Sequence, residues 1–104
     1  MIRHLVLVKF AVDARAETIE AIFRELDGLK AVVPGMLSFQ GGANVSPEGL
    51  SRGFTHAFVV DFADIAARDG YLVHPAHQAA GARLVAATQG GIEGLVVIDV
   101  EIGG

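Results

Sequence analysis

The sequence predicts an α+β fold of order βαββαβ, in which four strands form one antiparallel sheet and two such sheets pack face to face as a dimeric α/β barrel. Three observations predict this fold. Strand-like and helix-like patterns alternate along 104 residues, a length that forms one domain. The composition is 52% hydrophobic and 19% charged, which is apolar for a domain with so much surface for its volume. The predicted strands are also apolar on both faces.

The predicted strands are short segments rich in apolar and β-branched side chains. They cover residues 2–10, 36–40, 54–62 and 94–102. With right-handed crossovers, this order gives a ferredoxin-like sheet with both helices on one face. The connection at residues 41–53 combines glycines, serines and a proline, so we expect it to be the most mobile internal loop.

Two helical segments connect the strands. The first covers residues 15–30, with Asp13 as its N-cap and with apolar side chains spaced three and four residues apart. The second begins after a cap at Asp64 and is interrupted at His74. It resumes at Pro75, a residue type that suits the first position of a helix.

Both faces of the predicted sheet carry apolar side chains that must pack against other residues. In the first strand, His4 and Val6 share one face, whereas Leu5 and Leu7 share the other. An antiparallel sheet with one solvated face alternates apolar and polar residues, and two helices cover only one face. We therefore expect the second face to pack on a second copy through an interface above ~2,000 Å². The expected interface consists of Leu5, Leu7, Val59 and the fourth strand.

The composition also excludes several partners. The longest uncharged apolar stretches, at residues 5–8 and 94–98, are far shorter than a bilayer span, so the apolar excess favours a homodimer over a membrane protein. A net charge of −4 without a basic cluster argues against nucleic acid. The start of the chain lacks the features of a signal peptide and the chain has no cysteine, so we expect a cytoplasmic protein.

Four segments of the chain match a known family when they are taken together. They are MIRHLVLVKF at residues 1–10, VPGM at 33–36, GFTHAF at 53–58 and YLVHPAH at 71–77. On these motifs the whole chain, 1–104, resembles the stress-responsive A/B barrel (Dabb) domain. The resemblance implies a dimeric α+β barrel.

The resemblance also implies candidate site residues. One plant member of the family closes the ring of a linear polyketide by an aldol-type reaction that uses a tyrosine and a histidine. These two residues match Tyr71 and His77, and two strand histidines of that enzyme match His4 and His56. Its first helix carries an aromatic pocket residue, for which this chain offers Phe23.

His77 and Tyr71 are the candidate catalytic residues. His77 lies near the start of the helix that begins at Pro75, where the helix dipole keeps an imidazole neutral and able to accept a proton. The Tyr71 hydroxyl can donate a hydrogen bond to a carbonyl oxygen and support a developing enolate. The alternative interpretation is structural, with His74 as a helix cap and His77 as a residue that holds the kink.

We expect a small, mostly apolar pocket between the sheet and the helices. The candidate ligand-binding residues are His4, His56, Val6, Phe23, Phe58 and His74. The alternative is that His4 and His56 are core histidines whose nitrogens are paired by hydrogen bonds.

Two functions remain open. The first is a homodimer that binds a small apolar or keto compound, and the second is a lyase, cyclase or isomerase that abstracts a proton next to a carbonyl with a histidine base and a tyrosine. The four histidines have no carboxylate at a metal-binding spacing, and nothing singles out an axial haem ligand. We therefore expect neither a metal nor a cofactor.

Overall fold

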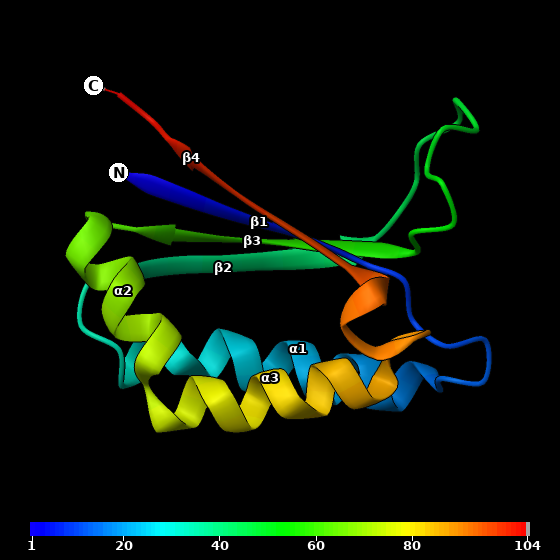
Figure 1. Ribbon diagram of the computed structural model, residues 1–104, viewed down its shortest axis with the longest axis horizontal. Helices are drawn as coiled ribbons and strands as arrows, with labels where there is room; N and C mark the ends of the chain where they lie inside the picture. Colours follow the sequence, from blue (N-terminus) through cyan, green and yellow to red (C-terminus); the bar gives the residue numbers. More distant parts are fainter. Residues whose placement is uncertain (104) are drawn as a thin grey trace.

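The computed structural model describes residues 1–103 and has the predicted order of elements (Figure 1). The strands form one antiparallel sheet in the order β2-β3-β1-β4, and Figure 1 shows α1 and α3 side by side on one face of it. This arrangement confirms the ferredoxin-like fold. The elements are β1 (Ile2–Val8), α1 (Ala16–Gly28), η1 (Leu29–Ala31), β2 (Met36–Ala43), β3 (His56–Phe62), α2 (Ile65–Val73), α3 (Pro75–Ala87), η2 (Gly91–Gly94) and β4 (Leu95–Glu101).

The core lies between the sheet and the helices. Alternate residues of the central strands β1 and β3 point toward the helices, and α1 and α3 meet them with an apolar stripe. Complete burial of a valine, leucine, isoleucine or phenylalanine side chain stabilises the fold by roughly 1.5–3 kcal/mol. The contributors are Ile2, Val6 and Val8 of β1, Phe58, Val60 and Phe62 of β3, Ile22 and Leu26 of α1, and Ala80 and Leu84 of α3.

The opposite face of the sheet, here called the outer face, is largely apolar and exposed in the single chain. Leu7, Ile98 and Val100 are 39%, 55% and 41% exposed. The strand register places Leu5 beside Val59 and Ile98, and Leu7 beside Val96, so these side chains form one continuous patch. The apolar part of the outer face consists of Leu5, Leu7, Val59, Val96, Ile98 and Val100, and the ion pair of Arg3 with Asp61 lies at one end of the same face.

The predicted cap of the first helix is wrong. Arg15, rather than Asp13, is the N-cap residue of α1, and no side chain caps that end. Asp13 belongs instead to a turn that the Ala14 N–H closes on the Ala11 carbonyl at 2.9 Å. The other predicted cap is confirmed, because Asp64 Oδ1 accepts a hydrogen bond from the Ala67 N–H at 2.8 Å.

The predicted loop at residues 41–53 begins too early. β2 continues through Gly41 and Gly42 to Ala43, so the connection to β3 covers residues 44–55. Gly41 has a packing role within the strand. A Cβ at this position would lie 3.0 Å from Phe58 Cβ and 3.1 Å from Phe23 Cε2. Glycine thus lets the Phe23 ring approach the sheet, and the mobility of the shorter loop stays a prediction.

Gly41→Ala should lower the free energy of unfolding by about 1 kcal/mol, because the new methyl group overpacks against Phe23 and Phe58. Gly42→Ala is the matched control, since a Cβ there meets no atom within 4 Å. Urea denaturation of both variants measures the difference. Equal stability of the two variants would contradict this role of Gly41.

Candidate active site

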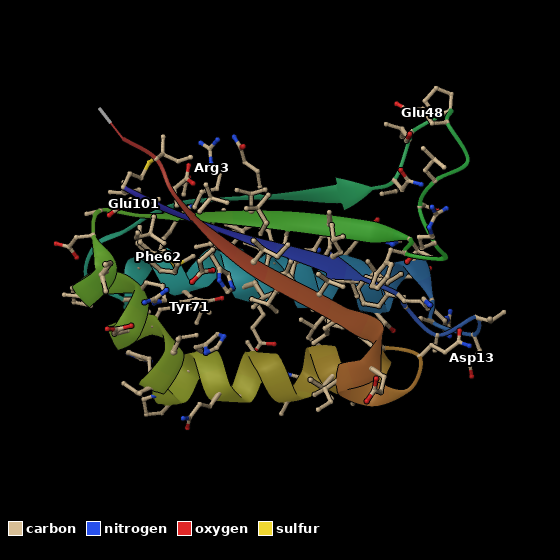
Figure 2. All side chains as sticks on the ribbon, turned by 45° about the horizontal axis from the view of Figure 1, so that its top comes forward. Arg3, Asp13, Glu48, Phe62, Tyr71 and Glu101 are labelled. Carbon is tan, nitrogen blue, oxygen red and sulfur yellow. The ribbon has the colours of Figure 1, made fainter. Side chains whose placement is uncertain are left out.

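A pocket of about 250 Å³ lies between the sheet and the helices α2 and α3. Its polar side chains are His4 of β1, Tyr71 of α2 and His77 of α3. In Figure 2, Tyr71 and Phe62 lie close together beneath the sheet, and their ring centroids are 4.9 Å apart. The remaining lining is apolar and consists of Val6, Leu26, Phe58, Leu72, Gly81, Leu84, Val85, Leu95 and Val97.

Five of the candidate residues come together in this pocket. They are His4, Val6, Phe58, Tyr71 and His77. Tyr71 and His77 meet because α2 and α3 join at a sharp bend, where His74 is extended and Pro75 begins the next helix. Their rings stack with centroids 3.9 Å apart and an interplanar angle of 36°.

Three of the candidate residues lie outside this pocket. His56 pairs with Val8 and is therefore roughly 13 Å along the strand from His4. Its ring packs edge-on against Phe10, and its Nδ1 lies 2.8 Å from Thr55 Oγ1. Phe23 packs against Phe39 and His56. His74 caps α3, where its Nδ1 accepts a hydrogen bond from the Ala76 N–H at 3.0 Å.

His4 belongs to a chain of charged hydrogen bonds. Asp99 lies directly opposite it on β4, and His4 Nδ1 is 2.6 Å from Asp99 Oδ1. Arg68 Nη1 of α2 donates to the other carboxylate oxygen at 2.6 Å. Burial alone would raise the pKa of Asp99, but the hydrogen bonds from Arg68 and His4 outweigh it and hold this pKa below its ordinary value. A carboxylate at this nitrogen keeps the proton of His4 on Nδ1 and leaves the lone pair on Nε2.

Burial also sets the protonation of the other two polar side chains. Tyr71 is 1% exposed, and burial raises the pKa of its phenol, which therefore stays protonated and able to donate. Burial likewise lowers the pKa of His77, and positive charge on His4 or His74 would lower it further, against an opposing hydrogen bond with the backbone of Leu72. His77 is thus neutral at pH 7.

His77 also carries an unsatisfied polar atom. Its Nδ1 is buried and has no hydrogen-bond partner within residues 1–103. Buried polar atoms of folded proteins nearly always have a partner, because an unpaired one loses its interaction with water and gains nothing in return. A polar atom of a ligand in the pocket would supply the missing hydrogen bond.

The sequence did not identify Asp99 or Arg68 as site residues. The one signal for Asp99 was a single carboxylate in the apolar fourth strand, in LVVIDV at residues 95–100. Its meaning depends on the pairing of β1 with β4, which sets Asp99 opposite His4 across 95 positions of sequence. Arg68 reaches the same carboxylate from α2.

Residues 1–103 offer neither a metal-binding cluster nor a membrane-spanning helix. No three or more histidine, aspartate or glutamate side chains are grouped in this range so as to hold a metal ion. None of the helices in this part of the chain is both long and apolar enough to cross a membrane.

The fold and the pocket define a class of small ferredoxin-like α+β proteins. Residues 2–102 match the model of the stress responsive A/B barrel domain family, to which this chain belongs. It is 33% identical over 76 residues to the stress-response A/B barrel domain-containing protein HS1 of Arabidopsis thaliana, covering 73% of this chain and 70% of that relative. It is 28% identical over 76 residues to olivetolic acid cyclase of Cannabis sativa, with coverage of 73% and 75%.

A similar solved structure is a dimeric ferredoxin-like protein from Jannaschia sp. CCS1. The TM-score is 0.89 at 37% sequence identity, and the match covers 97% of this chain and 98% of that one.

The free energy of unfolding should fall as the pH is lowered from about 6.5 toward 5, because burial lowers the pKa of His77 and of His56 in the folded chain. Above the unfolded pKa both states are neutral and the full stability is present. Below it, the unfolded chain binds protons that the folded chain does not. His77→Gln should remove its share of this dependence, as measured by denaturant titrations across the range. An unchanged dependence in the variant would contradict the burial of a neutral His77.

Proposed function

We propose that this chain binds a small apolar carbonyl compound in the pocket and removes a proton from the carbon next to the carbonyl group. One observation carries the proposal. At one end of an apolar pocket, a histidine held by a carboxylate meets a buried phenol and a neutral imidazole with an unpaired nitrogen. General acid–base chemistry beside a ketone needs a base and hydrogen-bond donors within reach of one small molecule.

The proposed base is His4, through Nε2. When Nε2 takes the proton, Asp99 stabilises the imidazolium through the hydrogen bond at Nδ1, as an orienting carboxylate does in a histidine–aspartate pair. Arg68 keeps that carboxylate ionised and in place. The sequence favoured His77 as the base, but burial makes His77 a weaker proton acceptor.

Tyr71 and His77 are the proposed hydrogen-bond partners of the substrate. The Tyr71 hydroxyl donates a hydrogen bond to the carbonyl oxygen, where negative charge develops as the carbon loses its proton. The single proton of the neutral His77 ring serves the hydrogen bond with the backbone of Leu72, so the unpaired Nδ1 accepts a hydrogen bond from a hydroxyl group of the substrate. The proton moves to His4, and the electrons of the broken C–H bond form the enolate.

One relative supports an enzyme of this type. Olivetolic acid cyclase is named as a cyclase, and it is 28% identical to this chain over 76 residues. Enolate formation is a step that cyclases, lyases and isomerases acting beside a carbonyl can share. The alternative function is ligand binding without catalysis, in which the pocket holds the same compound but transfers no proton.

We also propose that the working form is a homodimer in the cytoplasm, with the outer face of one copy packed on that of the other. The outer face is apolar and unprotected in the single chain. The similar Jannaschia protein is dimeric. A chain that is 52% hydrophobic and has no cysteine is consistent with an oligomer in a reducing compartment.

The protein should accelerate the exchange of protons next to the carbonyl of methyl ethyl ketone for deuterium in heavy water, followed by proton NMR. His4→Gln should slow this exchange about a hundredfold and Asp99→Asn about tenfold, because the first removes the base and the second its charged partner. Asp69→Asn is the matched control, since Asp69 pairs with the same Arg68 without touching His4.

The exchange experiment separates the two functions. Binding of the ketone without faster exchange would support the non-catalytic alternative and contradict the proposed proton transfer. If His77→Gln slowed exchange as much as His4→Gln while Asp99→Asn had no effect, His77 would be the base.

Sedimentation at micromolar concentration should give a dimer, because the outer face exposes a continuous set of large apolar side chains in the single chain. Ile98→Glu should dissociate or unfold it, since a charge would be buried without a partner. Val12→Glu, at a site that is 96% exposed in a turn, should leave the dimer intact. A folded, stable monomer of the natural chain would contradict the proposed assembly.

A further inference from the structure

The lining of the pocket is polar at one end and apolar at the other. Along α3 its lining residues are His77, Gly81, Leu84 and Val85, whose spacings of four, three and one place them in one stripe of the helix. From His77 to Val85 this stripe is about 12 Å long. Figure 1 shows that α3 runs back beneath the sheet toward η2, where β4 begins.

The opposite wall follows the same direction. His4 pairs with Asp99 at the polar end, and Val6 pairs with Val97 farther along. Leu95 closes the apolar end next to Val8, and Val97 is 55% exposed at the edge of the sheet. A ligand whose carbonyl lies at the histidines therefore meets an apolar lining where it extends along α3.

Gly81 is the smallest residue on this path. It lies one helical turn beyond His77, in the interior of α3, where glycine is less favourable than alanine. Neither the backbone nor the packing requires it, because its φ angle is not positive and an added Cβ would meet no atom within 4 Å. Because glycine has no side chain, Gly81 leaves space in the pocket that it lines.

We propose that Gly81 determines substrate specificity, by leaving open the part of the pocket that accepts an unbranched aliphatic tail attached to the carbonyl group. The preferred substrate class is then a ketone with a linear chain on one side. This inference rests on the proposed function, which puts the carbonyl group at His4, Tyr71 and His77. Gly81 selects by volume and takes no part in the proton transfer.

The test compares two ketones and three variants. Binding of acetone and of methyl hexyl ketone is followed through the ring resonances of His4 and His77 in NMR titrations. The natural protein should bind the long ketone more tightly than acetone. Gly81→Val should weaken binding of the long ketone about tenfold, which corresponds to the exclusion of about two methylene groups, and should change the dissociation constant of acetone less than about twofold.

Two further variants test whether weaker binding by Gly81→Val comes from a general effect on folding. Gly81→Ala should raise the melting temperature, because alanine favours the helix, and should still weaken binding of the long ketone, though less than valine does. Gly70→Val is the matched control, since Gly70 lies in α2, does not line this pocket, and has no atom within 4 Å of the position that a Cβ would take. It should leave both affinities unchanged.

The outcomes distinguish the two proposals. If Gly81→Val and Gly81→Ala bind both ketones as tightly as the natural chain does, the role of Gly81 is refuted and the proposed function stands. The same holds if their affinities for the two ketones fall equally. If neither ketone perturbs His4 and His77 in the natural chain, the proposed function is refuted together with this inference.

Discussion

The register of β1 against its two neighbours is the constraint on which the other features depend. β1 is a central strand, paired with β3 on one side and β4 on the other. Side chains alternate across a sheet, so this register directs His4 and Val6 toward the helices and Leu5 and Leu7 away from them. A slip of β4 by one residue would move Asp99 to the outer face and leave His4 buried without a partner.

The same layering creates two apolar surfaces with different uses. On the helix side, α1 and α3 cover the sheet but leave a pocket beside α2, which His4, Tyr71 and His77 line. On the outer face, Leu7 and Ile98 are exposed in the described part of the single chain. One face supplies the pocket and the other supplies the proposed dimer contact. A substituted side chain on one face therefore does not touch the residues of the other face.

Low solvent access gives the pocket its chemistry. Burial raises the pKa of Tyr71 and lowers that of His77, so both are neutral near pH 7, with the phenol able to donate a hydrogen bond and His77 Nδ1 able to accept one. Asp99 stays ionised because Arg68 and His4 outweigh its burial. A single negative charge is thereby held next to one histidine, at the end of an otherwise apolar space, where it favours proton uptake by that histidine.

The sequence by itself determined the order of the elements, the two apolar faces of the sheet and the proximity of Tyr71 to His77. These follow from periods of two and 3.6 residues and from the bend at His74, all of which are local. The tertiary structure decided that Asp99 meets His4, that His56 lies apart from the pocket, and that Gly41 belongs to a strand. These depend on register and on packing between segments distant in sequence, which local patterns do not encode. Asp99 and His4 are 95 positions apart, and only the pairing of β1 with β4 brings them together.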